Sequence, residues 1–320
     1  MPLHWKLNLL LKANNLINPL PDMEKISAKS FREYNEKGYK KLFPLVEYKN
    51  LQLYDIKNTF FENDNAKIAL RIYKPTIQRN LPILMYFHGG GFVVGNLETH
   101  DKLCRRLAKL SNCIVVAVDY RLAPEYRFPT AHYDCYEATR WAFDNAKSFG
   151  GNATQIAVCG DSAGGNLATG VCMLAKEKAN FEISYQILLY PCTDGNLTMP
   201  SIESLQKGYI LTKDVMKFFL KCYQNPKFPI THHLFSPMYA QNLEKLPPAL
   251  IITAEFDPLK DEGKQYADNL KKAGVKVDFE EAKGMVHLFL QMPKLLKKAR
   301  KTIKEIGDKL KTEFGMNGRL

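Results

Sequence analysis

The segment Gly160-Asp161-Ser162-Ala163-Gly164-Gly165 follows a short apolar run, Gln155–Cys159, and begins a helical pattern that extends to Lys178. A Gly-x-Ser-x-Gly pentapeptide in this setting is typical of a strained turn between a strand and a helix, where the serine hydroxyl is exposed. On its own such a pentapeptide is a weak indication, because short motifs recur by accident. Its weight here comes from the other motifs and from their order along the chain.

A second glycine-rich segment, His88-Gly89-Gly90-Gly91-Phe92, also follows an apolar run, Ile83–Phe87. A loop of glycines leaves backbone N–H groups bare, and such groups can stabilise negative charge that develops on an oxygen atom. The sequence therefore places a candidate nucleophile and candidate oxyanion donors directly after two predicted strands.

Apolar runs alternate with helical patterns from about residue 55 onward. The predicted strands are Asn58–Glu62, Ile68–Tyr73, Ile83–Phe87, Cys113–Val118, Gln155–Cys159, Gln186–Leu189, Ala249–Thr253 and Val275–Glu281. The predicted helices are Thr99–Ser111, Ala131–Phe149, Gly164–Lys178, Asp261–Ala273 and Lys294–Phe314. The first two strands are expected to pair antiparallel through Asn63-Asp64-Asn65. The remaining alternation predicts an α/β fold, a mostly parallel sheet with helices on both faces.

Two segments depart from this alternation. Residues 1–50 lack strand character and are predicted to be helical, with interruptions at Pro and Gly. Residues 193–247 also lack a convincing strand, and they include a helical piece at Lys213–Tyr223. An insertion of this length in an α/β core is more often functional than idle. We interpret residues 1–50 and about 193–233 as a helical cap over a catalytic domain formed by residues 51–320.

Candidate partners for the serine follow it in the chain. Serine needs an adjacent base, and the base needs an acid that fixes its tautomer. In α/β enzymes built on this turn, the acid comes next in the sequence and the histidine last. Asp257 follows the predicted strand Ala249–Thr253, and His287 follows the last predicted strand. The order therefore predicts Asp257 as the acid and His287 as the base for Ser162.

Other polar residues near these motifs compete for the same roles. Glu255 lies two residues before Asp257 and is an alternative acid. Asp161 and His88 adjoin the serine turn and the glycine loop, and we interpret both as hydrogen-bonded structural residues.

Five motifs, in order between about residues 50 and 310, resemble those of the hormone-sensitive-lipase-like group of α/β-hydrolases. The matching residues are His88-Gly89-Gly90-Gly91-Phe92, Tyr120-Arg121-Leu122-Ala123-Pro124-Glu125 with Phe128-Pro129, Gly160 to Gly165, Asp257-Pro258-Leu259 with Asp261-Glu262, and His287 followed by Phe289. The resemblance is specific, and its Gly-Asp-Ser-Ala-Gly-Gly form is similar to the bacterial esterase branch. It implies an eight-stranded α/β-hydrolase fold with a helical cap.

The resemblance also implies an activity. A member of this group is expected to be a serine carboxylesterase with nucleophile Ser162, acid Asp257 and base His287. The implied oxyanion donors are the backbones of Gly90, Gly91 and Ala163. From the position of Phe92 after the glycines we expect an aromatic ring beside the substrate, and short-to-medium acyl esters as substrates. An amidase or deacetylase, a lipase, a non-catalytic ligand-binding protein and a membrane-surface protein remain alternatives.

Composition narrows the expected cofactors and compartment. The chain has 320 residues, of which 46% are hydrophobic and 24% charged, as is usual for a globular enzyme. Seven scattered cysteines without a Cys-x-x-Cys motif favour free thiols in a reducing compartment, so we expect a cytoplasmic protein. No metal-ligand cluster or dinucleotide fingerprint is visible, and the pair His232-His233 stands alone. We therefore expect no cofactor and no metal.

The net charge of +12 raises the question of nucleic-acid or membrane partners. Residues 294–320 contain nine Lys or Arg against three Asp or Glu, and apolar residues recur among them at helical spacing. This pattern predicts a C-terminal helix with one buried stripe and a solvated basic face. We expect a small-molecule ester as the partner and no nucleic acid. Contact of the basic terminal segments with anionic lipid is the less favoured interpretation and stays open, as does the oligomeric state.

Overall fold

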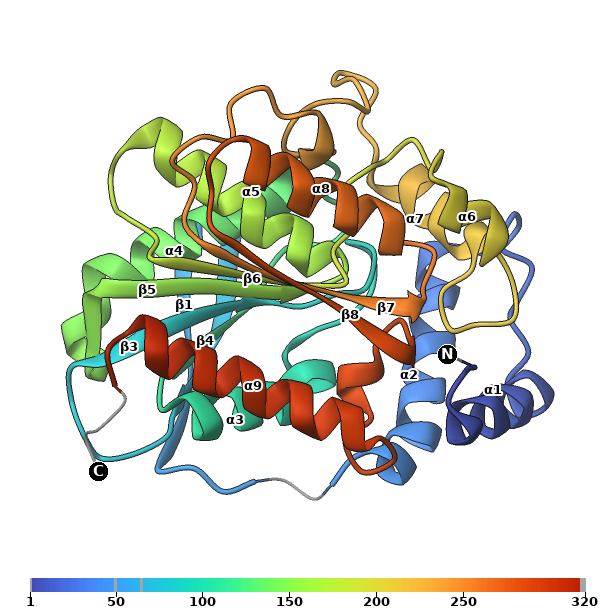
Figure 1. The fold of residues 1–320 in the computed structure, drawn as a ribbon, viewed down its shortest axis with the longest axis horizontal. Coiled ribbons are helices and arrows are strands. Elements are labelled where there is room, and N and C mark those ends of the chain that lie inside the picture. The colour runs from blue at the N-terminus through green and yellow to red at the C-terminus, as the bar shows by residue number, and fades with distance from the viewer. Residues whose placement is uncertain (1, 49–50, 64–65, 317–320) are drawn as a thin grey trace.

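A twisted eight-stranded sheet crosses the centre of the molecule in the computed structural model, which describes residues 2–48, 51–63 and 66–316 (Figure 1). Its strands lie in the order β1-β2-β4-β3-β5-β6-β7-β8. The strands are β1 (Asp55–Asn63), β2 (Ala66–Lys74), β3 (Leu81–Phe87), β4 (Ile114–Asp119), β5 (Gly151–Asp161), β6 (Tyr185–Leu189), β7 (Ala249–Phe256) and β8 (Val277–Val286). β2 is antiparallel to both β1 and β4, and the pairs from β4 to β8 are parallel. The predicted mostly parallel α/β sheet is confirmed. Asp64 and Asn65 of the predicted turn lie outside the described residues.

Helices cover both faces of the sheet (Figure 1). On one face lie α3 (Leu97–Ser111) and α9 (Lys297–Glu313). On the other lie α4 (Thr130–Phe149), α5 (Ala163–Lys178) and α8 (Lys260–Lys272). All five were predicted from the sequence, and their boundaries agree to within about three residues.

Several strands are longer than predicted: β5 begins at Gly151 rather than Gln155, and β8 ends at Val286 rather than Glu281. Two other boundaries differ for reasons that the local backbone shows. The last strand begins at Val277 rather than Val275, because Val275 still closes the preceding helix. Gly274 has φ +79°, and the N–H of Val275 donates to the Leu270 carbonyl at 3.0 Å, which is the left-handed ending common at helix C-termini. The last helix begins at Lys297 rather than Lys294, after an extended residue at Leu296.

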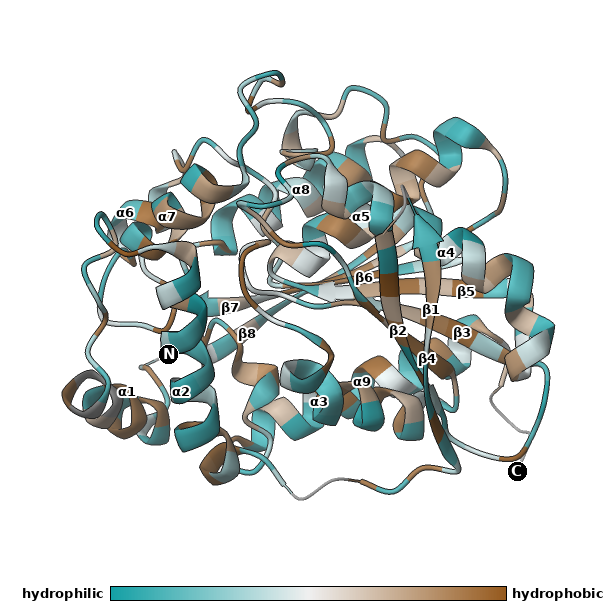
Figure 2. Cartoon of the chain, turned by 180° about the vertical axis from the view of Figure 1, so that it is seen from behind, coloured by the Kyte–Doolittle hydropathy of each residue, from teal (hydrophilic) through white to brown (hydrophobic). Residues whose placement is uncertain are grey.

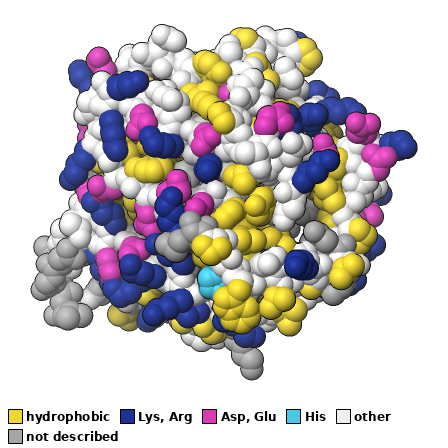
Figure 3. All heavy atoms as spheres, turned by 45° about the vertical axis from the view of Figure 1, so that its right-hand side comes forward, with side chains coloured by type: hydrophobic (Ala, Val, Ile, Leu, Met, Phe, Trp, Pro, Cys, Tyr) yellow, Lys and Arg dark blue, Asp and Glu magenta, His cyan; other side chains and the backbone are white. Residues whose placement is uncertain are grey.

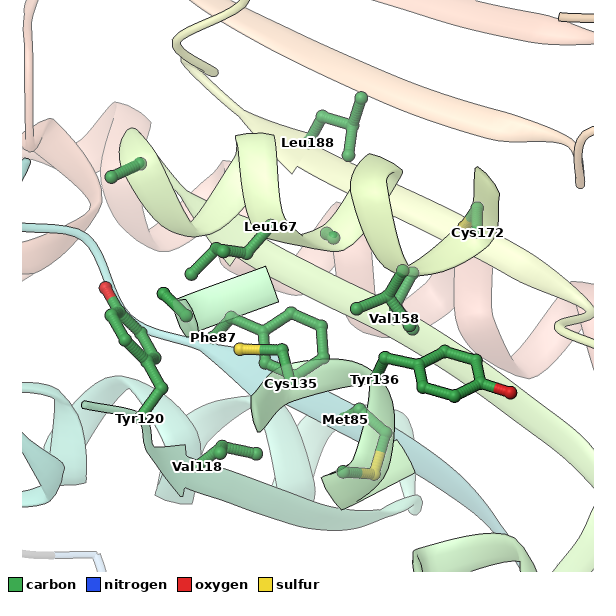
Figure 4. Packing of buried hydrophobic residues seen from close by; sticks show 14 of the residues in the cluster. Met85, Phe87, Val118, Tyr120, Cys135, Tyr136, Val158, Leu167, Cys172 and Leu188 are labelled. Carbon is green, nitrogen blue, oxygen red and sulfur yellow. The ribbon is translucent and has the colours of Figure 1, made fainter. Parts of the chain in front are cut away.

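The sheet separates two apolar clusters. β3 is buried along its whole length, so its alternate side chains fill opposite sides. Met85 and Phe87 contribute to the cluster beneath α4 and α5, where Leu167 of α5 also packs (Figure 4). The second cluster lies between the sheet and α3 and α9, and the predicted apolar stripe of α9 is buried there. Figure 2 shows mainly hydrophobic strands at the centre of the sheet and helices in which hydrophilic and hydrophobic residues alternate.

Four further helices lie at the end of the sheet where the parallel strands finish (Figure 1). They are α1 (Trp5–Ile17), α2 (Ala28–Val46), α6 (Pro200–Ser204) and α7 (Lys213–Tyr223). Two short 3-10 turns, Pro237–Tyr239 and Phe289–Gln291, complete the secondary structure of the described residues. None of the helices in these residues is long and apolar enough to cross a membrane.

The two N-terminal helices pack in different places. Phe31 of α2 contacts two rings of α7, with centroid distances of 4.9 Å to Phe218 and 5.7 Å to Phe219. In α1, by contrast, Leu7 and Leu11 are buried in the second cluster with the C-terminal part of α2 and the start of α9. Within residues 2–48, α2 therefore lies beside α7, and α1 lies beside the start of α9.

The core position Leu167 and the surface position Leu16 provide a matched test of this packing. Leu167 is completely buried, whereas Leu16 is 85% exposed. We expect Leu167→Ala to lower the free energy of unfolding by about 2–5 kcal/mol, through lost burial and the cavity it leaves. We expect Leu16→Ala to change it by less than about 0.5 kcal/mol. Urea unfolding followed by circular dichroism measures both, and equal effects would contradict the packing described.

Candidate active site

Ser162 occupies the turn between β5 and α5. Its φ of 57° and ψ of −120° are strained for a residue with a side chain. Backbone hydrogen bonds hold the turn, because the Ser162 N–H donates to Leu189 O at 2.8 Å and the Ser162 carbonyl accepts from Cys192 N at 3.2 Å. The helix after the turn also approaches β3 closely. A Cβ at Gly164 would lie 1.9 Å from the Phe87 carbonyl oxygen, so only glycine fits there.

Three predicted side chains meet in one hydrogen-bonded chain. Ser162 Oγ lies 3.0 Å from His287 Nε2, and His287 Nδ1 lies 2.6 Å from Asp257 Oδ2. All three residues are buried. An ionised Asp257 accepts a hydrogen bond from Nδ1–H, which leaves Nε2 as the acceptor for the serine hydroxyl. The second oxygen of Asp257 accepts from the backbone N–H of Leu259 at 2.9 Å, which fixes the orientation of the carboxylate.

Strand pairing explains why Asp257 and His287 are adjacent. β7 and β8 are parallel neighbours, and their last paired residues are Phe256 and Val286. Asp257 and His287 are the next residues of these two strands, so the sheet brings them to the same edge. The ladder shifts register between Ala254 and Phe256, at the end of β7.

The alternative acid, Glu255, points elsewhere. Its Oε2 accepts the backbone N–H of Gly284 at 2.7 Å, two residues before the end of β8. In the structure the histidine ring is hydrogen-bonded to Asp257 instead.

The glycine loop after β3 lies beside the serine. Gly91 and Ala163 line the same cavity as Ser162. Gly90 directly precedes Gly91 in the loop. Gly91 has φ +59°, and a Cβ there would lie 2.1 Å from the ring of Phe219. Within the described residues we find no acceptor for the N–H groups of Gly90 and Gly91. The N–H of Ala163 is in the first turn of α5, where helices leave donors unsatisfied. These donors are free to bind a ligand.

Asp161 connects the serine turn to the glycine loop. Its carboxylate accepts hydrogen bonds from the Tyr86 hydroxyl at 2.7 Å and from the Gly89 N–H at 2.9 Å. His100 Nε2 lies 3.4 Å away. Burial raises the pKa of Asp161, but the nearby His100 and these hydrogen bonds outweigh it and lower the pKa below its usual range. Asp161 is therefore a buried carboxylate that fixes the loop position.

His88 also contacts the glycine loop. Its ring stacks on Tyr120 with a centroid distance of 4.3 Å, and its Nδ1 lies 2.7 Å from the Gly89 carbonyl. Burial lowers the pKa of His88 to about 3, so the ring is neutral at physiological pH. In this neutral ring Nδ1 carries the proton, because the Gly89 carbonyl oxygen that it contacts can only accept a hydrogen bond.

An apolar cavity opens over the serine. Its lining residues are Gly91, Phe92, Ser162, Ala163, Cys192, Leu197, Leu211, Met216, Phe219, Leu220, Tyr223 and Leu259. Phe92 stacks on Tyr223 with 3.8 Å between ring centroids, so the predicted aromatic residue forms part of the wall. Four α7 residues in this wall recur at positions 216, 219, 220 and 223. That helical spacing is visible in the sequence and could have identified them.

Two supporting residues were given no role in the sequence analysis, although Glu262 belongs to one of the matching motifs. Tyr190 is buried directly after β6, and its ring meets the His287 ring edge-on at 4.8 Å between centroids. Glu262 is buried in α8, and its Oε1 accepts the N–H groups of Thr193 at 2.6 Å and Asp194 at 3.2 Å. Burial raises the pKa of Glu262 well above its usual range. Glu262 thus holds the start of the segment that leads to α6 and α7.

The described residues contain no group of three or more His, Cys, Asp or Glu that could hold a metal ion. The rings of His232 and His233 stack with 4.6 Å between centroids, and His233 Nε2 lies 3.3 Å from Glu177. Neither histidine lines the cavity over Ser162.

Known proteins share this architecture. A family model described as the alpha/beta hydrolase fold matches residues 84–291. The chain is 38% identical over 252 residues to an arylesterase from Saccharolobus solfataricus, covering 78% of this chain and 81% of that protein. It is 42% identical over 225 residues to a carboxylesterase from Mycobacterium tuberculosis, covering 69% and 70%. An ethyl acetate hydrolase from Pseudomonas putida is 37% identical over 240 residues, covering 74% and 76%.

Solved structures agree over nearly the whole chain. A hyperthermophilic esterase from the archaeon Pyrobaculum calidifontis has a TM-score of 0.91 and 38% identity, covering 98% of this chain and 99% of that one. The chain belongs to the hormone-sensitive-lipase-like group of the α/β-hydrolase family, and it is a carboxylic ester hydrolase.

Proposed function

We propose that the protein hydrolyses short-to-medium acyl esters through an acyl-enzyme formed on Ser162. The observation that carries this proposal is the hydrogen-bonded chain from Asp257 through His287 to Ser162, with the hydroxyl facing an apolar cavity. No part of the proposed reaction calls for a cofactor.

The first half of the reaction forms the acyl-enzyme. As Ser162 Oγ attacks the ester carbonyl carbon, His287 Nε2 takes its proton, and Asp257 stabilises the resulting imidazolium through Nδ1–H. The carbonyl oxygen becomes negatively charged in the tetrahedral intermediate. The N–H groups of Gly90, Gly91 and Ala163 then donate to this oxyanion. His287 returns the proton to the leaving alcohol oxygen as the carbon–oxygen bond breaks.

The second half repeats the chemistry with water. His287 takes a proton from a water molecule, whose oxygen attacks the acyl carbon. The tetrahedral intermediate again lies against the same backbone donors. When it collapses, Ser162 Oγ leaves, receives the proton from His287, and the carboxylic acid is released.

A cap over the cavity sets the expected substrate size. We propose that α2 and the segment of about 193–233 form this cap, because Phe31 of α2 packs on Phe219, which lines the cavity. Arg32 of α2 fastens the helix to the catalytic domain, since it donates to Val93 O at 2.8 Å and pairs with Glu125 at 2.6 Å. A closed apolar pocket holds a small acyl group and excludes a long one. The similarity to an ethyl acetate hydrolase supports this size class.

We also propose a reducing, cytoplasmic environment. All seven cysteines are free thiols, and six of them are buried. Proteins that mature in oxidising compartments commonly use such residues in disulfides. As the partner of the active site we propose a small-molecule ester, and nothing in the described site favours a nucleic acid.

Removing the nucleophile tests the proposed role of Ser162. We expect Ser162→Ala to lower kcat for p-nitrophenyl butyrate by about a million-fold, because no other hydroxyl contacts His287 Nε2 in the described site. The circular dichroism spectrum and the unfolding midpoint should stay close to those of the wild type. A folded variant that retains more than about one per cent of the activity would remove Ser162 from the mechanism.

Truncating Phe219 tests the proposed cap. With p-nitrophenyl esters of increasing chain length, kcat/KM should rise about fourfold per methylene while each is buried, which corresponds to about 0.8 kcal/mol, and then fall when the pocket is full. We expect Phe219→Ala to move the maximum to longer chains, whereas Phe60→Ala, at a half-exposed site on β1, should leave it in place.

A rate that climbs to the longest chains, with a jump when the substrate forms an emulsion, would indicate a lipase instead. An anilide measured beside the esters separates esterase from amidase activity.

A further inference from the structure

Helix α1 exposes a line of apolar side chains to solvent. Trp5, Leu9 and Leu16 are 64%, 60% and 85% exposed, although each is large and hydrophobic. Together with the exposed Ala13 they recur at intervals of four, four and three residues, which places them on one side of the helix. Leu7 and Leu11, on the other side, are already buried against the domain. The exposed line is therefore not needed to hold α1 in place.

The neighbouring helix α2 also exposes hydrophobic side chains to solvent. Near its C-terminal end, Leu45 is 63% exposed, and Tyr48 just beyond it is 43% exposed. Lys37 and Lys41 precede Leu45 by two turns and one turn, and both are exposed. Single exposed hydrophobic residues are normal on protein surfaces, but aligned ones mark an interaction site.

Lysines lie on the two helices that form this surface. α1 and α2 together contain seven Lys or Arg and two Glu, and α1 itself has no acidic residue. Of the seven, Arg32 pairs with Glu125 and Lys40 pairs with Glu36. The Nζ atom of Lys6 lies 5.6 Å from the ring centroid of Trp5, so a cation adjoins the largest exposed ring. Figure 3 brings this side of the molecule forward and shows hydrophobic side chains gathered among Lys and Arg side chains.

We propose that α1 docks the enzyme on the surface of an anionic lipid bilayer. Trp5, Leu9 and Leu16 would enter the boundary between headgroups and acyl chains, with the helix lying parallel to the surface. Lys12 of α1 and Lys37 and Lys41 of α2, all exposed, would contact the anionic headgroups. Aromatic and leucine side chains on one face with lysines beside them are the combination that binds helices in this way. A docked enzyme meets esters that partition into lipid.

Flotation with lipid vesicles tests the proposal on the full chain. We expect the wild type to float with phosphatidylcholine vesicles that contain 30% phosphatidylglycerol, on the order of tenfold more than with pure phosphatidylcholine, and to be released by 0.5 M salt. The variant Trp5→Ser/Leu9→Ser/Leu16→Ser should lose at least about tenfold of this binding.

A matched control removes exposed hydrophobic residues elsewhere. Phe60 and Ile77 are 50% and 71% exposed and lie outside α1 and α2, so Phe60→Ser/Ile77→Ser should float like the wild type. Both variants should hydrolyse water-soluble p-nitrophenyl acetate at the wild-type rate, because none of the five residues lines the cavity. That rate shows that the variants are folded.

Fluorescence locates the contact. The chain has two tryptophans, so Trp141→Phe leaves Trp5 as the single emitter. We expect its emission to shift to the blue with anionic vesicles and to be quenched by brominated acyl chains.

Three results would overturn the proposal. The wild type could fail to float, the α1 variant could float as well as the control, or Trp5 emission could stay unchanged. A wild-type dimer that the α1 variant converts to monomer, with no flotation of either, would assign the line to contact with a second copy of the chain.

Discussion

The hydrogen bond between Asp257 and His287 is the interaction on which the rest of the site depends. At 2.6 Å, between buried groups, it determines which ring nitrogen carries the proton and how the imidazole plane lies. Without it the histidine could not present Nε2 to Ser162 as an acceptor. The sheet supplies this contact, because β7 and β8 run in parallel and end side by side at Phe256 and Val286. The edge-on ring of Tyr190 then limits rotation of the imidazole.

The glycine loop after β3 depends on a second buried contact. The Asp161 carboxylate ties the loop after β3 to the turn after β5, through hydrogen bonds to the Gly89 N–H and the Tyr86 hydroxyl. The close approach of Gly164 to Phe87 brings the same two segments together without a side chain between them. Donors held in this way need little reorganisation when charge develops on the substrate, which is the main source of electrostatic catalysis. The strained backbone of Ser162 is maintained by this surrounding framework.

Sequence patterns predicted the sheet and the meeting of Ser162, Asp257 and His287, because both depend on local signals. Buried parallel strands are visible in the sequence as apolar runs. Ser162, Asp257 and His287 each follow such a run, which predicts that they lie at the same edge of the sheet. Other features depend on contacts that span the chain. The places of α2 beside α7 and of α1 beside the start of α9 are set by packing partners far away in sequence. The role of Tyr190 against the imidazole likewise has no local pattern, since it arises only when β6 lies next to β7.

The central claim is that the Asp257–His287 hydrogen bond prepares Ser162 for attack. A comparison of the variants Asp257→Asn and Glu255→Gln tests this claim most directly. Asp257→Asn removes the charge and favours the wrong tautomer, so kcat should fall about ten-thousand-fold with little change in KM. Glu255→Gln should retain kcat within about tenfold of the wild type, because the Glu255 carboxylate binds the Gly284 N–H and not the histidine. A tenfold change corresponds to about 1.4 kcal/mol of activation free energy. Kinetics of the two variants at pH 7 with p-nitrophenyl butyrate decide the matter. A Glu255→Gln variant that is slower than Asp257→Asn would contradict the assignment of the acid and the mechanism built on it.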